Sequence, residues 1–197
     1  MTLFPPPPAF LLAVMFTGEA LLMRSRLSGD ARRTSDRGSL RLILAVIAAS
    51  VVIAGVVGRR FPQARFAALF DLDASAVAAL QATGFALFVA GLALRWYSMR
   101  YLGRLFTFDV AVAADHRVVD TGPYRLVRHP AYTGSLLSFV GLGLYAGNAL
   151  ALPLLLVPIA LALRYRIGVE EAALTSALGP RYADYAARTR RLVPFVY

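Results

Sequence analysis

Two segments in the second half of the chain collect residue types that can do chemistry. Residues 116–134 hold both histidines of the chain, together with three arginines and two tyrosines. Residues 164–191 hold two adjacent glutamates, Glu170 and Glu171, which follow Arg166 by four and five positions. Guanidinium and imidazole groups can bind anions, and carboxylates can bind cations. Together the two segments have the side chains to bind a ligand that carries both signs of charge.

The first segment predicts a turn that leads into a helix. Gly122 can adopt a positive φ and Pro123 fixes its own φ at about −65°. Pro130 is typical of the first turn of a helix, where no intrahelical donor is lost. His129 would then lie at the helix start, where free N–H groups favour a carboxylate or another anion. The alternative is an interfacial loop whose arginines meet lipid phosphates and whose tyrosines lie at the membrane boundary.

The second segment has two interpretations. If it is helical, Arg166 and Glu170 are four residues apart and share a face. They could form an exposed ion pair that contributes only about 0.2–0.5 kcal/mol. They could instead form an electrostatic clamp, in which the glutamate meets a cationic cofactor and the arginine meets an anionic acceptor. Gly179 and Pro180 predict the end of this helix, and residues 182–191 predict a short amphipathic piece at the membrane surface.

Composition places these segments in a membrane protein. The 197 residues are 58% hydrophobic and 16% charged, whereas soluble domains are about 45–50% apolar and about 25% charged. The net charge is +10, and all 21 basic residues are arginines. They flank apolar runs, which favours anionic lipid head groups over nucleic acid as the partner. The absence of cysteine and of HExxH spacing predicts no metal site.

Apolar runs predict about five transmembrane helices. Residues 10–23 are apolar except for Glu19, and residues 42–58 and 77–94 carry no charge. These runs are close to the lower limit of about 17 residues for crossing a bilayer. Residues 131–163 also carry no charge, and Gly147 and Asn148 interrupt them near the middle. This stretch therefore predicts a helical hairpin of two spans, and the two polar segments on either side of it, 95–130 and 164–197, should meet in space.

The arginines predict the orientation, since cytoplasmic loops of membrane proteins carry excess Lys and Arg. With five spans, eighteen arginines fall on one side, and only Arg59, Arg60 and Arg65 fall on the other. A four-span arrangement would divide the basic segments between both sides. We therefore expect a multi-pass protein of the cell (inner) membrane, with the N-terminus outside and both polar segments in the cytoplasm.

The order of these motifs is similar to a known family. The run GPYRLVRHPAYTG at 122–134, a hairpin, the pattern R-x-x-x-E-E-x-x-L and the pattern G-x-x-Y-x-x-Y resemble the isoprenylcysteine carboxyl methyltransferases and their bacterial relatives. The resemblance covers about residues 95–197, which we expect to form the catalytic region. Residues 1–94 would supply the N-terminal transmembrane helices. The implied fold is all-α and polytopic, with a cytoplasmic cofactor site beside the hairpin.

The resemblance also implies roles for individual residues. S-adenosylmethionine is the implied cofactor, and Arg166 and Glu170 are the implied catalytic residues, with Arg166 facing the carboxylate of the methyl acceptor. The implied acceptor is a lipophilic small molecule or a lipidated substrate that enters from the bilayer. The positions that match the family's cofactor pocket are His116, Arg117, Val118, Val119, Tyr124, His129, Pro130, Ala131, Tyr132, Glu170 and Glu171.

A rival interpretation is an NADPH-dependent membrane reductase of the sterol type, because those enzymes share a related RHP-x-Y segment and hairpin. They need a site for a 2′-phosphate and an acid that protonates the reduced carbon. The adjacent glutamates beyond Arg166 fit the methyltransferases better. A non-catalytic membrane scaffold is a third possibility, and no motif in the chain supports it.

Overall fold

The computed structural model describes residues 6–24, 36, 38–108 and 117–194. Within these ranges every regular element is a helix. The α-helices are α1 (Pro8–Arg24), α2 (Ser39–Arg60), α3 (Phe66–Leu69), α4 (Ala74–Leu102), α5 (Pro130–Ala146), α6 (Ala151–Leu178) and α7 (Pro180–Arg188). The 3-10 turns are η2 (Pro62–Ala64), η3 (Gly103–Leu105) and η4 (Gly122–Arg125). The predicted all-α class is confirmed.

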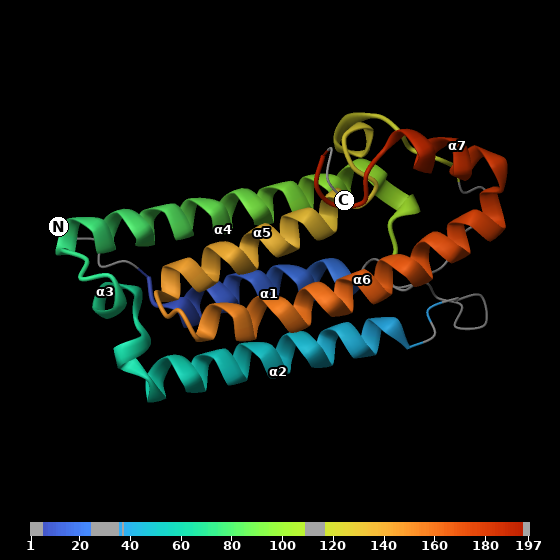
Figure 1. Ribbon diagram of the computed structural model, residues 1–197. Helices are drawn as coiled ribbons and strands as arrows, with labels where there is room; N and C mark the ends of the chain where they lie inside the picture. The colour runs from blue at the N-terminus through green and yellow to red at the C-terminus, as the bar shows by residue number, and fades with distance from the viewer. Residues whose placement is uncertain (1–5, 25–35, 37, 109–116, 195–197) are drawn as a thin grey trace.

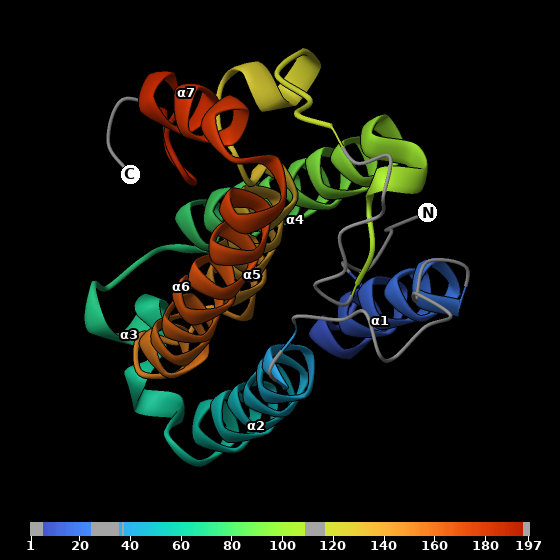
Figure 2. The same cartoon turned by 90° about the vertical axis from the view of Figure 1, so that its right-hand side faces the viewer.

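Five long helices, α1, α2, α4, α5 and α6, run side by side (Figure 1). Helix α3 lies at one end of this bundle, and α7 and the segment before α5 lie at the other. Figure 2 looks along the bundle from the end that carries α7. The two polar segments therefore meet at one end of the bundle, as the hairpin predicts.

The outer surface of the bundle is apolar along its length. Three of the described helices, α2, α4 and α6, are long and apolar enough to cross a membrane, whereas α1 and α5 have 17 residues each. Large apolar side chains of the long helices remain exposed, among them Val52, Ile53, Leu154, Val157 and Leu161. Because contiguous exposed apolar surface on this scale is rare in soluble monomers, lipid is its solvent. The chain is a membrane protein, and the number of five spans stays a prediction.

Helices α4 and α5 contact each other through glycines. A Cβ atom added at Gly91 would lie 2.5 Å from the Ser138 nitrogen, and one added at Gly141 would lie 2.3 Å from the Phe88 nitrogen. The Ser138 hydroxyl donates a hydrogen bond to the Phe88 carbonyl at 3.2 Å. Small residues allow such close backbone approach between membrane helices, whose association gains little from the hydrophobic effect. The register of α5 against α4 is therefore tightly defined.

The turn between α5 and α6 occurs where the sequence predicts it. Gly147 has a φ of +72°, the left-handed conformation that commonly ends a helix. The Asn148 side-chain oxygen accepts hydrogen bonds from the Leu150 and Ala151 nitrogens at 3.1 and 3.0 Å. Its amide nitrogen donates to the Phe61 carbonyl at 3.0 Å. The predicted hairpin is confirmed. The start of α5 and the C-terminal half of α6, which lie away from this turn, carry residues of the site described below.

Two helices continue beyond the apolar runs. Helix α4 ends at Leu102 and α6 at Leu178, whereas the uncharged runs end at residues 94 and 163. A charge can mark the edge of a bilayer without ending a helix, since arginine and glutamate have high helix propensity. Arg95, Arg166 and Glu170 are therefore held on rigid helices. The proposed division between residues 94 and 95 stays a prediction, and α4 is continuous across it.

Candidate active site

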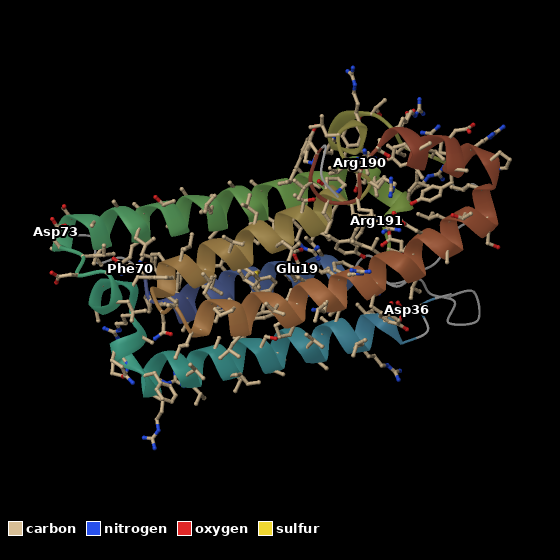
Figure 3. The ribbon with its side chains drawn as sticks, viewed as in Figure 1. Glu19, Asp36, Phe70, Asp73, Arg190 and Arg191 are labelled. Carbon is tan, nitrogen blue, oxygen red and sulfur yellow. The ribbon has the colours of Figure 1, made fainter. Side chains whose placement is uncertain are left out.

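The C-terminal segment closes over the start of α5. The Arg128 and His129 nitrogens donate hydrogen bonds to the Arg190 and Arg191 carbonyls at 2.7 and 3.0 Å. The Thr133 hydroxyl donates to the Leu192 carbonyl at 2.7 Å. Figure 3 shows Arg190 and Arg191 at the end of the bundle that carries α7. The two polar segments are thus joined by backbone bonds as well as by side chains.

Glu171 contacts the side chains of two arginines and a histidine. Its carboxylate lies 2.8 Å from Arg128 Nε, 3.3 Å from His129 Nε2 and 2.8 Å from Arg191 Nη2. Only 13% of the Glu171 side chain is exposed. Arg128 also donates to the Ala186 carbonyl at 2.8 Å. Since its oxygens are already occupied, Glu171 fastens the C-terminal segment to α6.

Glu170 and Arg166 are connected through a tyrosine. The Tyr132 hydroxyl donates to Glu170 Oε2 at 2.9 Å and accepts from Arg166 Nε at 2.9 Å. The Tyr132 ring stacks on the His129 ring with centroids 5.5 Å apart. Glu170 is the more exposed of the two glutamates, with 32% of its side chain accessible. The alternative of an exposed Arg166–Glu170 pair is wrong, because Arg166 is 4% exposed and bonds Tyr132 instead.

The remaining contacts of Arg166 come from distant segments. Arg166 Nη1 donates to Asp36 Oδ1 at 2.8 Å and to the Ser39 hydroxyl at 2.7 Å. Arg166 Nη2 donates to the Phe108 carbonyl. The guanidinium is therefore held in a fixed plane by three segments of the chain.

One side of Arg166 opens into a first cavity, which has a mixed polar and aromatic lining. Two tyrosines of α7, Tyr182 and Tyr185, form part of this wall. The Tyr182 hydroxyl is buried and has no hydrogen-bond partner among the described residues. A buried hydroxyl without a partner is costly, which points to a ligand that bonds it. The lining residues are Leu102, Leu105, Phe106, Thr107, Arg117, Val118, Val119, Tyr124, Arg128, His129, Arg166, Glu170, Leu174, Leu178, Tyr182 and Tyr185.

The tyrosines of this cavity are neutral donors at physiological pH. Burial raises the pKa of Tyr124 and of Tyr182 above the usual value of a phenol. Burial likewise raises the pKa of Tyr185 to about 12. The Tyr185 hydroxyl donates to the Tyr124 carbonyl at 2.7 Å, and the Tyr124 hydroxyl donates to the Ser98 carbonyl at 3.2 Å. The wall is thus fixed by its own hydrogen bonds.

The other side of Arg166 opens into a second cavity, which is largely apolar. Its polar groups include a charged pair, in which Arg95 Nε and Nη2 lie 2.6 and 2.5 Å from the two oxygens of Glu19. The two cavities share Phe106, Thr107 and Arg166. The lining residues of the second cavity are Met15, Phe16, Glu19, Met23, Leu40, Ile43, Leu44, Ile47, Leu92, Arg95, Phe106, Thr107, Phe108, Tyr132, Ser135, Ser138, Phe139, Ile159, Leu163 and Arg166.

Comparison with known proteins assigns this architecture to a family. Residues 80–181 match the sequence model of the family described as phospholipid methyltransferase, and they make up more than half of the chain. The chain belongs to the phospholipid methyltransferase family. The match includes the segment before α5, the whole hairpin and the start of α7. Arg166, Glu170 and Tyr132 therefore lie inside it, whereas Tyr182 and Tyr185 follow it.

Several relatives bear the name that the sequence resemblance predicts. Protein-S-isoprenylcysteine O-methyltransferase B of Arabidopsis thaliana is 31% identical over 115 residues, which are 57% of this chain and 58% of that protein. The cobalt-zinc-cadmium resistance protein CzcN of Cupriavidus metallidurans is 34% identical over 98 residues, or 49% of this chain and 45% of that protein. The matched part thus spans less than two thirds of either relative. The predicted resemblance to isoprenylcysteine carboxyl methyltransferases is confirmed.

A solved structure supports the fold. The eukaryotic intramembrane Ras methyltransferase ICMT aligns with a TM-score of 0.61 at 21% identity, covering 98% of this chain and 70% of that one. The alignment includes the N-terminal helices, which carry no diagnostic sequence motif. The phospholipid methyltransferase family member described here therefore has the ICMT membrane fold along nearly all of its length.

The predicted cofactor residues that the structure describes fall into three groups. Several line the first cavity, Tyr132 lines the second, and Pro130, Ala131 and Glu171 line neither. Pro130 and Ala131 are buried where α5 begins. His116 lies outside the described residues. The predicted residues that line the first cavity are Arg117, Val118, Val119, Tyr124, His129 and Glu170.

Sequence reasoning missed three groups around the site. Asp36 and Ser39 bond Arg166, and Glu19 pairs with Arg95. Tyr182 belongs to the family-like pattern, but it received no role. One available signal was Glu19 itself, because a charge inside a transmembrane segment is expensive and usually has a function or a partner. Asp36 gave no comparable signal, because it lies outside the helices, two positions before the N-cap Gly38 of α2.

Proposed function

We propose that this protein transfers the methyl group of S-adenosylmethionine to the carboxylate of a lipophilic acceptor that enters from the bilayer. The observation that carries the proposal is that a polar cavity and an apolar cavity meet at Arg166. The name of the Arabidopsis relative supports methyl transfer to an oxygen of an isoprenylcysteine. The acceptor is accordingly a lipophilic carboxylate, either a small molecule or a lipidated chain.

The first cavity suits S-adenosylmethionine. This molecule carries a sulfonium, an ammonium, a carboxylate and an adenine ring. Glu170 has one carboxylate oxygen bonded to Tyr132, and it is the acidic side chain that lines the described part of this cavity. A carboxylate and aromatic faces attract cations. Arg128 and His129 offer donors for an anionic end, and the unpartnered Tyr182 hydroxyl offers one more polar contact.

The second cavity suits an acyl or prenyl chain. Its walls are formed by aliphatic and aromatic side chains of α1, α2, α4, α5 and α6, including Ile43, Leu92, Phe139 and Leu163. An apolar chain in this cavity would leave its polar end at Arg166. A planar guanidinium can hold a carboxylate through two parallel hydrogen bonds.

The reaction needs positioning more than acid–base chemistry. When bound, S-adenosylmethionine would supply a methyl group on a sulfonium, a leaving group that takes the electrons of the broken C–S bond as the acceptor oxygen bonds the methyl carbon. Because the acceptor attacks as an anion, no proton has to be removed. Arg166 orients this oxygen, and Glu170 attracts the cationic end of the donor. Alignment and fixed electrostatics should provide most of the rate enhancement.

The arginine distribution supports a cytoplasmic site in the cell (inner) membrane. Arg125, Arg181, Arg188 and Arg190 belong to the end of the bundle that carries α7. Anionic lipids of the inner leaflet attract such basic segments. Membrane lipids are therefore partners of this end, and nucleic acid is not a proposed partner.

Purified protein in detergent, with methyl-labelled S-adenosylmethionine, tests the proposal. The acceptor panel contains N-acetyl-S-farnesylcysteine, long-chain fatty acids, lipophilic amines and lipophilic phenols. We expect label to transfer to at least one carboxylate, and Arg166→Gln to abolish the transfer. Tight binding of NADPH without binding of S-adenosylmethionine would instead support the reductase. Transfer to amines or phenols alone would overturn the assignment of a carboxylate acceptor.

A further inference from the structure

Arg166 already holds a carboxylate that comes from the chain itself. Asp36 Oδ1 accepts a hydrogen bond from Arg166 Nη1 at 2.8 Å, and Asp36 Oδ2 accepts from the Leu40 nitrogen at 3.1 Å. Asp36 also accepts from the Ser39 hydroxyl at 2.8 Å. The same guanidinium is the group proposed to bind the acceptor carboxylate. Asp36 and the acceptor would therefore use the same donor.

The two members of this pair differ in their freedom to move. The Arg166 side chain is 5% exposed and the Asp36 side chain is 14% exposed. Arg166 lies within α6 and is also fixed by Tyr132 and the Phe108 carbonyl. Asp36 precedes α2 and belongs to no helix. If an anion arrives, Asp36 is the partner that can turn toward water.

The pair also explains how Arg166 remains stable without an acceptor. A buried charge that loses its partner is strongly destabilising, so the guanidinium needs a counter-ion at rest. Burial alone would raise the pKa of Asp36, but hydrogen bonds from Leu40, Ser39 and Arg166 outweigh it and hold the pKa below its ordinary value. Asp36 is therefore an anion at neutral pH.

Arg95, the other arginine that lines the second cavity, is not available to bind the acceptor carboxylate. Both oxygens of Glu19 bond Arg95, which also donates to the Ser135 hydroxyl at 2.9 Å. Arg166 has five N–H groups, and described residues accept four hydrogen bonds from them. An acceptor carboxylate that is to be held by two bonds must displace a present partner.

We propose that Asp36 is the resting counter-ion of Arg166 and is exchanged for the carboxylate of the acceptor, which makes Asp36 a specificity-determining residue. This proposal rests on the proposed function. It adds that Asp36 competes with the acceptor carboxylate for the guanidinium of Arg166. A neutral lipophile can occupy the apolar cavity without displacing Asp36, whereas an anion must exchange with it. After exchange, Asp36 Oδ2 keeps its bond to the Leu40 nitrogen, so the start of α2 remains capped.

Binding of a matched pair of ligands tests the exchange. The ligands are N-acetyl-S-farnesylcysteine and its carboxamide, titrated by calorimetry into the full chain in detergent with S-adenosylhomocysteine present, so that no turnover occurs. Asp36→Asn keeps a capping oxygen and removes the charge. We expect this variant to bind the carboxylate at least about tenfold more tightly, the effect of one charge-assisted hydrogen bond. Its affinity for the carboxamide should be unchanged.

Asp73→Asn is the matched control. Asp73 also caps a helix, since its side chain accepts from the Ala76 nitrogen at 2.7 Å. It lies at the opposite end of the bundle from Asp36 (Figure 3). The ratio of carboxylate to carboxamide affinity should stay at the wild-type value in Asp73→Asn. If Asp36→Asn unfolds at the assay temperature, Asp36→Ser provides the same loss of charge with a shorter capping oxygen.

The outcomes separate the exchange from the methyl transfer. An unchanged or lower affinity ratio in the Asp36 variants overturns the exchange, and so does failure of the carboxylate to bind either wild type or variant. An unchanged ratio in a protein that methylates carboxylates leaves the proposed function intact. A raised ratio without any methyl transfer supports the exchange and counts against the proposed function.

Discussion

Helices α4 and α5 contact each other through backbone and small side chains along the bundle, whereas the end of the bundle that carries α7 is filled with charged and aromatic groups. Gly84 and Gly91 on α4 face Gly141 and Gly134 on α5, with room for no Cβ atom. At the site end, two arginines and a histidine converge on Glu171, and Glu170 shares Tyr132 with Arg166.

The difference indicates what each region contributes. The glycine contacts fix the register of α5 against α4. The start of α5, with His129 and Tyr132, is therefore held at a fixed position along α4. The site end contains charges that packing does not require, such as Glu170, whose side chain is 32% exposed, accepts from the Tyr132 hydroxyl and lies 3.9 Å from His129 Nδ1. Changes at the interface should therefore act on stability, and changes at the site should act on binding and rate.

The strongest test of the interface is Gly141→Ala. The added Cβ would lie 2.3 Å from the Phe88 nitrogen and 2.5 Å from the Gly84 carbonyl oxygen, which are backbone atoms that cannot turn away. We expect the free energy of unfolding in detergent to fall by about 4 kcal/mol or more, the range of severe packing defects. Thermal unfolding of the purified protein measures this.

Gly55→Ala is the control for that prediction. Gly55 lies in α2, and a Cβ atom added there would meet no other segment of the described chain within 4 Å. Alanine has the higher helix propensity, so stability should rise by up to about 1 kcal/mol. Equal losses in both variants would mean that the α4–α5 contact does not define the register.

At the site, the largest effect should come from Arg166→Lys. Lysine retains a positive charge beside Asp36. It lacks the planar guanidinium, which donates to Tyr132 and to Asp36 at the same time. Turnover should fall about 10²-fold or more, the usual cost of one electrostatic partner in an active site. Affinity for S-adenosylmethionine should remain close to that of wild type. Wild-type turnover in this variant would make Arg166 a structural residue.

The sequence predicted the hairpin well because its determinants are local. Gly147 ends α5 with a positive φ, and Asn148 bonds nitrogens two and three residues ahead. The meeting of the two polar segments also follows from the hairpin alone. The spacing of Arg166 and Glu170 was a weaker guide, because the Tyr132 hydroxyl lies between them.

The partners that sequence reasoning missed are far away along the chain. Asp36 lies 130 positions before Arg166, and Glu19 lies 76 positions before Arg95. Neither short motifs nor helical periodicity can relate positions at such distances. Only the packing of α1 and α2 against the hairpin and α4 brings these carboxylates to the arginines.

The adjacent glutamates allow a finer test of the division between binding and stability. Glu170→Gln should weaken binding of S-adenosylmethionine by about 1.5–3 kcal/mol, because a charge-assisted contact is lost. Glu171→Gln should instead lower the free energy of unfolding, because Arg128, His129 and Arg191 lose their shared anion. Calorimetry and thermal unfolding of both variants measure the two effects. Loss of cofactor affinity in Glu171→Gln alone would reverse the roles assigned here.

The smallest expected effect concerns two tyrosines of α7. The Tyr182 hydroxyl is buried without a hydrogen-bond partner among the described residues, whereas the Tyr185 hydroxyl donates to the Tyr124 carbonyl at 2.7 Å. Tyr182→Phe should leave the stability of the ligand-free protein unchanged or higher, because an unsatisfied group is removed. Its affinity for S-adenosylmethionine should fall by about 0.5–1.5 kcal/mol if the ligand bonds this hydroxyl.

Tyr185→Phe should show the opposite pattern. It removes a satisfied hydrogen bond and leaves the Tyr124 carbonyl without its donor, so stability should fall by about 1 kcal/mol. The two phenylalanine variants have the same change in volume and lie on the same helix, so a difference between them isolates the hydroxyl groups. If Tyr182→Phe lowers stability and leaves cofactor affinity at the wild-type value, the Tyr182 hydroxyl has a structural partner. The Tyr182 side of the first cavity would then contribute to stability, as the α4–α5 interface does, and not to cofactor binding.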